Sequence, residues 1–245
     1  MDYNLTWTKA TEEANLLIIM ITLGFIVFWF AGKSEDLLRR LVERLGPEPG
    51  QARHVFIKRI VGILCFGLIP ALVLFATQGR TWAEYGVADH FPPAVFYWTI
   101  GLSVVLIFMT ARSTRHSHNL EQYPEIRTTN WSLKLVFWSA LSWMGYLIAY
   151  ELMFRGFLLF SCVRAFGVWP AILINTSIYS LVHVPKSARE GIGAIPLGLL
   201  LCIITLQTQT IWVALFVHWV LSLSNEWFSL RFQPEMQVIH FSKNK

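Results

Sequence analysis

Six polar residues lie in strongly apolar parts of the sequence and fall into pairs spaced four residues apart: Glu151 with Arg155, Tyr179 with His183, and His218 with Ser222. On a helix, residues i and i+4 share a face, so each pair forms one polar patch. A carboxylate and an imidazole that meet in a water-poor pocket can activate a water molecule. A second imidazole and a hydroxyl can donate hydrogen bonds to an oxyanion. If the three patches converge, they have the groups needed for hydrolysis.

Each pair also has a purely structural interpretation. Glu151 and Arg155 could form an ion pair that joins two helices. His183 stands at the end of an apolar run, where an imidazole can simply lie at the membrane interface, and His218 is flanked by aromatic residues that it could pack against. Charged groups at bilayer depth cost about 2.5–3.5 kcal/mol each, so they normally face a bundle interior or a wet cavity. The pairs therefore mark the candidate site.

The composition is that of a membrane protein. Of 245 residues, 55% are hydrophobic and 14% are charged, whereas a soluble domain has about 25% charged residues. Seven apolar runs carry the excess, and most are long enough for a helix to cross most or all of a hydrocarbon core of about 30 Å. They cover residues 15–32, 60–77, 93–110, 134–150, 168–183, 191–206 and 210–228. The sequence predicts an all-α fold, a polytopic membrane helical bundle with about seven transmembrane helices.

The net charge of +5 comes from the placement of basic residues in alternate connections. Lysine and arginine gather between runs one and two, between three and four, ahead of run six and after run seven. Apart from Arg155, which extends run four, the other connections hold only Arg80 and Arg164, and Lys9 lies ahead of run one. The positive-inside rule then predicts an N-terminus outside and a C-terminus in the cytoplasm. The basic excess reflects orientation and contact with the lipid bilayer, so no nucleic-acid partner is expected.

The chain divides into three expected regions. Residues 1–133 hold three transmembrane helices, the first retained rather than removed as a signal peptide, and a cytoplasmic loop. In this loop the leucines at positions 37, 38, 41 and 45 fall on one face and predict an amphipathic helix that ends at Gly46 and Pro47. Residues 134–230 hold the polar pairs, and residues 231–245 form a cytoplasmic tail.

The segments that contain the pairs resemble a known family. YELMFRGFLL, SIYSLVHVP and the stretch that ends FVHWVLSLSN are similar to the three motifs of the CPBP family of intramembrane proteases, which includes CAAX prenyl endopeptidases and bacteriocin-processing or Abi-like immunity proteins. The family patterns are EExxxR, FxxxH and HxxxN, in this order and on separate helices. The similarity covers about residues 134–230.

The resemblance implies a role for each paired residue. Glu151 is expected as the acid or base, Arg155 as its orienting partner, and His183 as the imidazole that activates water. His218 and Ser222 are expected as oxyanion donors. The resemblance leaves the cofactor open: zinc held by His183, His218 and one acid is conceivable, while the family has also been described as a metal-free glutamate protease.

Two departures bear on catalysis. Tyr150 occupies the position of the first glutamate of the family motif, and Ser222 occupies that of the asparagine. Adjacent helical residues point about 100° apart, so Glu151 does not simply replace a carboxylate at position 150. Either the helix is rotated or locally unwound near Gly145 and Gly156, or catalysis is weakened or lost.

We therefore expect an intramembrane endopeptidase of a bacterial inner membrane that hydrolyses a peptide bond of a membrane-associated or prenylated protein or of a leader peptide. The expected partners are this peptide or protein substrate and the lipid bilayer. One alternative, favoured by Tyr150, is a catalytically inactive CPBP-like protein that binds membrane partners. Another is a proton-coupled transporter, since buried Glu, Arg and His suit a proton relay, although the sequence has no repeated half.

Overall fold

The computed structural model describes residues 8–114 and 117–239 and confirms the all-α membrane bundle. The helices are α1 (Lys9–Lys33), α2 (Glu35–Leu45), α3 (Pro47–Ile63), α4 (Ile69–Gln78), α5 (Pro93–Ser113), α6 (Ser117–Gln122), α7 (Leu133–Glu151), α8 (Leu159–Phe166), α9 (Val168–Leu181), α10 (Ala188–Thr208) and α11 (Trp212–Phe232). Two π-helical segments, Leu64–Leu68 and Leu152–Leu158, join α3 to α4 and α7 to α8. Two short strands, β1 (Asn130–Ser132) and β2 (Gln237–Ile239), pair in parallel.

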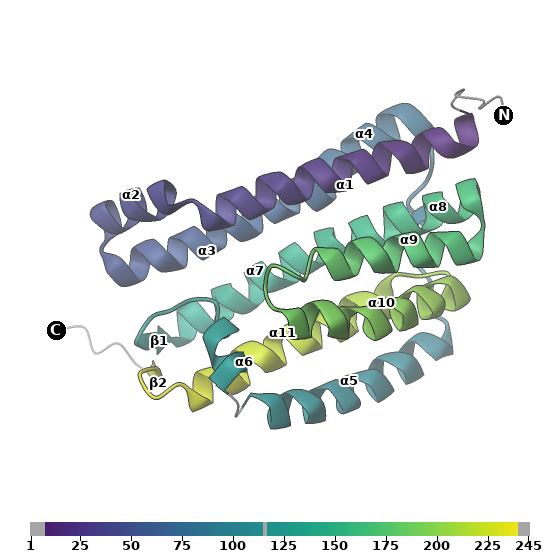
Figure 1. Ribbon diagram of the computed structural model, residues 1–245. Helices are drawn as coiled ribbons and strands as arrows, with labels where there is room; N and C mark the ends of the chain where they lie inside the picture. Colours follow the sequence, from purple (N-terminus) through teal and green to yellow (C-terminus); the bar gives the residue numbers. More distant parts are fainter. Residues whose placement is uncertain (1–7, 115–116, 240–245) are drawn as a thin grey trace.

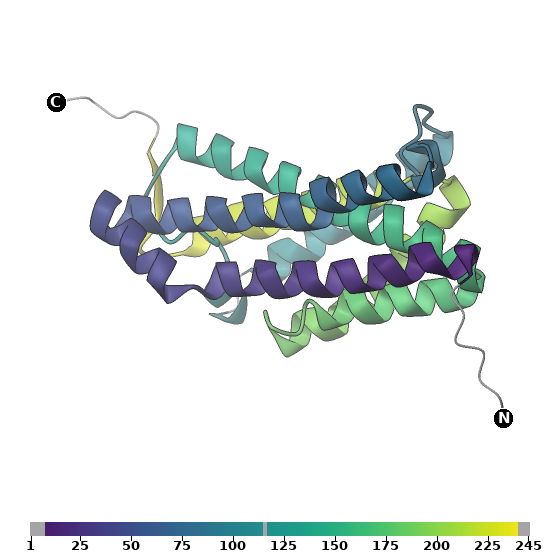
Figure 2. The same ribbon diagram turned by 90° about the horizontal axis from the view of Figure 1, so that it is seen from above.

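The helices that carry the polar pairs lie in the middle of the bundle. In Figure 1, α1 and the α3–α4 segment run along one side, and α5 runs along the opposite side against α11. Between them α9 packs on α8 and α10, while α7 packs on α3 and α11. Seen from above, in Figure 2, the long helices run roughly along one common direction. Side chains from the central helices can therefore face one interior space.

The expected number of seven transmembrane helices is not confirmed. Five helical segments of the described residues are long and apolar enough to cross a membrane, namely Thr11–Lys33, Pro47–Gln78, Pro93–Ser113, Leu133–Phe166 and Ala188–Thr208. Helix α9 has 14 residues and spans only about 21 Å. Helix α11 is long enough but contains His218, Asn225 and Glu226.

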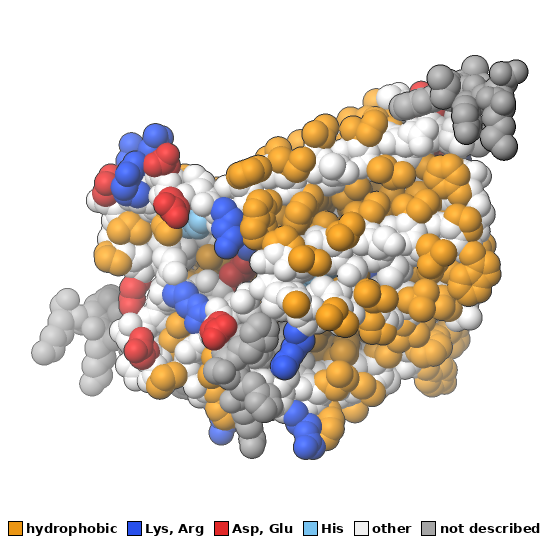
Figure 3. Space-filling model, viewed as in Figure 1, with side chains coloured by type: hydrophobic (Ala, Val, Ile, Leu, Met, Phe, Trp, Pro, Cys, Tyr) orange, Lys and Arg blue, Asp and Glu red, His pale blue; other side chains and the backbone are white. Residues whose placement is uncertain are grey.

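Hydrophobic and charged side chains occupy different parts of the surface. Hydrophobic side chains cover much of the face shown in Figure 3, whereas charged side chains gather toward the end that holds α2. The predicted amphipathic helix is confirmed as α2. It begins after Ser34 and ends at Gly46, and the Ser34 hydroxyl caps it by accepting a hydrogen bond from the backbone N–H of Leu37. None of its residues is buried, which suits a helix at the membrane interface.

A buried carboxylate fixes one end of the bundle. Glu13 of α1 accepts hydrogen bonds from the hydroxyls of Tyr85 at 2.6 Å and Ser161 at 2.8 Å. It also pairs with Arg164 at 2.8 Å and with Arg80 at 3.0 Å. These contacts tie α1 to α8 and to the loop that precedes α5. Because every partner is supplied from another element, the cluster specifies how those elements pack.

A second buried cluster joins α3, α7 and α11. The Arg59 guanidinium lies 3.0 Å from Glu125 and 3.5 Å from Glu226. Glu226 also accepts hydrogen bonds from the Ser139 hydroxyl and, at 2.8 Å, from the Trp143 indole. Neither cluster includes a residue of the polar pairs. The buried charged residues of these two clusters therefore serve to hold helices together.

Candidate active site

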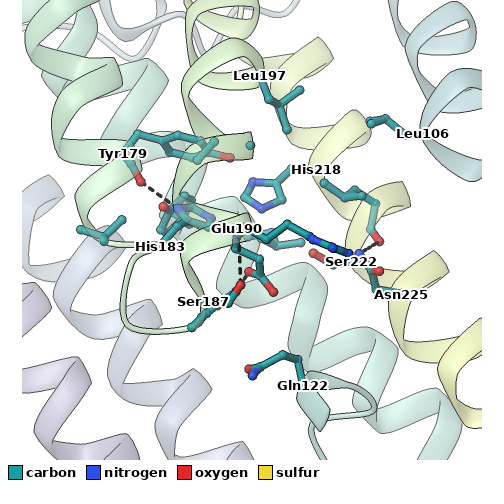
Figure 4. Close-up of a pocket in the computed structure, with 18 of the residues that line it drawn as sticks. Leu106, Gln122, Tyr179, His183, Ser187, Glu190, Leu197, His218, Ser222 and Asn225 are labelled. Atoms are coloured by element: carbon teal, nitrogen blue, oxygen red, sulfur yellow. Dashed lines mark hydrogen bonds and ion pairs between the residues drawn. The ribbon is translucent and has the colours of Figure 1, made fainter. Parts of the chain in front are cut away.

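A cavity of about 470 Å³ lies among α5, α7, α9, α10 and α11. Four of the residues singled out in the polar pairs line it: Tyr179, His183, His218 and Ser222. Figure 4 shows the His183 imidazole approaching from the end of α9 and the His218 imidazole approaching from α11, with Ser222 further along α11. Glu151 and Arg155 do not line the cavity. The structure thus brings two of the three patches to the cavity wall and places the third behind it.

Glu151 is completely buried and bonded to His218. Its Oε1 lies 2.5 Å from Nδ1 of His218, and its Oε2 lies 3.2 Å from Nη1 of Arg155. The Arg155 guanidinium is also completely buried and stacks on the Tyr179 ring at 4.0 Å. A carboxylate bonded to Nδ1 fixes the orientation and tautomer of the imidazole. This geometry favours an indirect role for Glu151, through His218.

The backbone around Glu151 is locally unwound, which was one of the alternatives that the sequence left open. A π-helical segment begins at Leu152, directly after Glu151, and includes Gly156. Within it the Phe154 carbonyl accepts a hydrogen bond from Asn175 of α9 at 2.5 Å. Gly145, the other glycine considered, lies within regular α-helix. The wider turn changes which side chains face the interior, and such segments are frequent at functional sites.

His183 is held with one nitrogen available. Its Nδ1 lies 2.7 Å from the backbone carbonyl oxygen of Tyr179. Because a carbonyl oxygen only accepts, Nδ1 carries the hydrogen and the neutral ring has its lone pair on Nε2. Gly198 of α10 allows this arrangement, since a Cβ at this position would come within 2.9 Å of the Tyr179 ring. His183 is therefore preorganised to accept a proton at Nε2.

Tyr150 forms part of the cavity wall beside both histidines. Its ring centroid lies 5.5 Å from that of His218 and 6.2 Å from that of His183. The side chain is 5% exposed, and its hydroxyl has no hydrogen-bond partner among the described residues. A phenol thus forms the part of the cavity wall that lies beside both histidines.

The cavity also contains polar residues that the sequence reasoning did not select. Asn225 lines it from α11, seven residues after His218, a spacing that returns to the same helical face. Glu190, in the first turn of α10, is the only acid on the wall within the described part of the chain, and its carboxylate lies 3.6 Å from Nζ of Lys186. Ser187 caps this helix by accepting from the backbone N–H of Glu190. The S-x-x-E spacing was the available sequence signal for a helix start.

The described residues do not offer a metal site. No three His, Cys, Asp or Glu side chains in 8–114 and 117–239 gather so that they could hold one ion. Glu151, the acid nearest His218, is already bonded to that histidine and to Arg155. The zinc alternative would need a third ligand beside His183 and His218, and these residues do not supply it.

Comparison with known proteins gives one match. Residues 131–224 match the family model described as type II CAAX prenyl endopeptidase Rce1-like. No curated protein and no solved structure matches the chain. The matched stretch starts just before α7 and ends within α11, so it contains the three motifs and both cavity histidines. Over residues 131–224 this membrane protein is therefore similar to the type II CAAX prenyl endopeptidases.

Proposed function

We propose that this protein is an intramembrane endopeptidase that hydrolyses a peptide bond of a membrane-associated or prenylated protein or of a leader peptide. The observation that carries the proposal is the cavity with two imidazoles, one with a free Nε2 and the other bonded to a buried carboxylate. The family match supports peptidase chemistry in general. The substrate and the residue roles below are part of the proposal.

In the proposed reaction His183 acts as the general base. Nε2 of His183 takes a proton from a water molecule, and the resulting hydroxide attacks the scissile carbonyl carbon. When the tetrahedral intermediate collapses, the C–N bond breaks and the protonated His183 returns the proton to the leaving amine. The His183 Nδ1–H remains bonded to the Tyr179 carbonyl throughout, which keeps the ring oriented.

In the proposed reaction, residues of α11 stabilise the negative charge of the oxyanion. The Ser222 hydroxyl and the Asn225 amide can donate hydrogen bonds to it, and both line the cavity on the side of His218. His218 can donate to the oxyanion from Nε2 when both of its ring nitrogens carry hydrogen, and its bond to the Glu151 carboxylate at Nδ1 keeps the ring oriented. Glu151 is thus a positioning residue, and Arg155 fixes its carboxylate through the buried ion pair.

The cavity walls support a substrate with both apolar and charged parts. Leu106 and Leu197 contribute apolar surface, whereas Lys186, Arg189 and Glu190 lie at the end where α10 begins. We propose that this end faces the cytoplasm, because the basic connections lie at the same end of the bundle as α2. The peptide bond would then be cleaved near the cytoplasmic face of the bacterial inner membrane.

One observation favours the inactive, partner-binding alternative. Tyr150 occupies the wall beside both histidines, and no carboxylate of the first motif faces the cavity. A protein of this kind would keep the cavity and bind membrane proteins without cleaving them. The two candidates differ in whether loss of His183 changes the set of cleaved proteins.

The test compares newly formed protein N-termini in membranes of cells that express the wild-type chain, His183→Ala or His90→Ala at equal levels. His90 is an exposed histidine in the loop before α5 and serves as the matched control. We expect a set of N-termini present with wild type and His90→Ala and absent with His183→Ala. Identical sets in all three, with all proteins folded, would reject the peptidase and favour the partner-binding protein.

A further inference from the structure

A second groove lies on the outside of the bundle between α3 and α7. It has a volume of about 640 Å³, which is within the range of roughly 300–1,000 Å³ typical of ligand sites. Its apolar walls are formed by Phe56, Ile60 and Ile63 of α3 and by Leu135, Trp138 and Leu141 of α7. We call it the α3–α7 groove. The cavity with the two histidines shares no lining residue with this groove.

The apolar walls are open to the side. Ile60 is 54% exposed, Trp138 49% and Leu141 47%. Both helices belong to segments that are long and apolar enough to cross a membrane. In a bilayer these side chains would face acyl chains rather than water, so the groove is accessible from the lipid phase.

One end of the groove is basic. Arg53 and Lys134 line it, both are exposed, and neither forms an ion pair with a described residue. The third cation on the wall, Arg59, is already paired with Glu125 and Glu226. No acid lines the groove in the part of the chain that the structure describes. Two cations thus remain without counter-charge at the end of an otherwise apolar groove.

The positions of the cations match the depth of a lipid headgroup. Lys134 is the second residue of the span that begins at Leu133, and Arg53 lies in the second turn of the span that begins at Pro47. Ile60 and Leu141 each stand seven residues further along their helices, which is about 10 Å deeper. A molecule with an anionic head and an apolar chain would have matching contacts at both levels.

We infer that the α3–α7 groove binds one anionic phospholipid, with its phosphate between Arg53 and Lys134 and an acyl chain along Ile60, Trp138 and Leu141. Basic pockets between membrane helices recognise such headgroups. A soluble phosphate would use only the two cations, and a zwitterionic lipid would bring its own positive charge next to them. The site is independent of the proposed peptidase activity.

Intact-complex mass spectrometry of the purified, delipidated protein in detergent tests the inference, with phosphatidylglycerol and phosphatidylcholine titrated separately. We expect wild type to bind one phosphatidylglycerol in preference to phosphatidylcholine. The double variant Arg53→Gln/Lys134→Gln should bind phosphatidylglycerol about 25-fold more weakly, at roughly fivefold for each cation. Arg53 and Lys134 are exposed, as are both residues of the control variant described next. An unchanged elution volume in size-exclusion chromatography and an unchanged thermal midpoint would verify that each variant is folded.

The control Arg40→Gln/Arg112→Gln removes the same charge from exposed positions on α2 and α5. It should bind phosphatidylglycerol like wild type, and millimolar inorganic phosphate should not displace the lipid. An equal loss in the control pair would show that only diffuse charge attracts the lipid and would overturn the site. Equal affinity of wild type for both lipids, or complete displacement by phosphate, would overturn it as well.

Discussion

Replacing Arg155 by methionine is expected to destabilise the bundle by about 3–5 kcal/mol, because it leaves a buried carboxylate without its counter-charge. Both side chains of the Glu151–Arg155 pair are completely buried, and their closest charged atoms are 3.2 Å apart. Methionine keeps most of the apolar stem of Arg155, so the lost volume contributes little. The exposed Arg40→Met on α2 is the matched control and should cost less than about 0.5 kcal/mol.

The double variant Glu151→Gln/Arg155→Met separates the effect of charge from that of packing. It removes both charges together, and a glutamine carbonyl can still accept the hydrogen bond from His218. Its cost should therefore be much smaller than the sum of the two single costs, with a coupling free energy of several kcal/mol. Unfolding in mixed micelles with increasing sodium dodecyl sulfate, followed by circular dichroism, gives the four free energies of this cycle.

Two results would refute this reasoning. One is a cost for Arg155→Met that equals the cost for Arg40→Met, which would mean that the carboxylate is not stabilised by Arg155. The other is strict additivity in the double variant, which would mean that Glu151 and Arg155 contribute independently. Either result would also remove the basis for treating Arg155 as the residue that fixes Glu151 next to His218.

Two further predictions concern the oxyanion donors and the dependence of stability on pH. Ser222→Ala and Asn225→Ala should each lower kcat about 10²- to 10³-fold with little change in KM, measured on a peptide identified from the new N-termini; unchanged kcat in both variants would exclude them as donors. Burial raises the pKa of the Glu125 carboxyl, but the charges of Lys58 and Arg59 outweigh this effect and hold the pKa below its usual value. Because the folded-state pKa is lowered, Glu125 stabilises the fold fully above about pH 5, and this contribution is lost as the pH falls below about 4. In Glu125→Gln the free energy of unfolding should depend less steeply on pH in this range. An unchanged slope would contradict a stabilising role for the Glu125 carboxylate.

The sequence determined the fold class and most of the candidate site. Continuous apolar runs require backbone hydrogen bonds to be satisfied within helices, so the all-α membrane bundle followed directly from composition. The spacing of four residues between polar side chains, in three ordered segments, selected His183, His218 and Ser222, all of which line one cavity. These features are local, because helical periodicity alone decides which residues share a face.

The number of spans and the exact neighbours of each side chain depended on tertiary packing. Hydropathy identifies α9 and α11 as apolar, yet their length and polarity fit an interior position between longer helices. Glu151 and Tyr150 are adjacent in sequence at the end of α7, and only the packing of α7 against its neighbours, α11 among them, decides which of them faces the cavity. Asn225 reaches the cavity because α11 presents that whole face to it.

The sequence by itself therefore determined which residues are polar inside the membrane and which of them share a helical face. The tertiary structure alone decided that Glu151 is bonded to His218 without lining the cavity, that Tyr150 forms part of the cavity wall, and that Glu190 lines the same cavity. The physical reason is that helical spacing fixes directions within one helix. The contacts between helices depend on how side chains far apart in the sequence pack against each other.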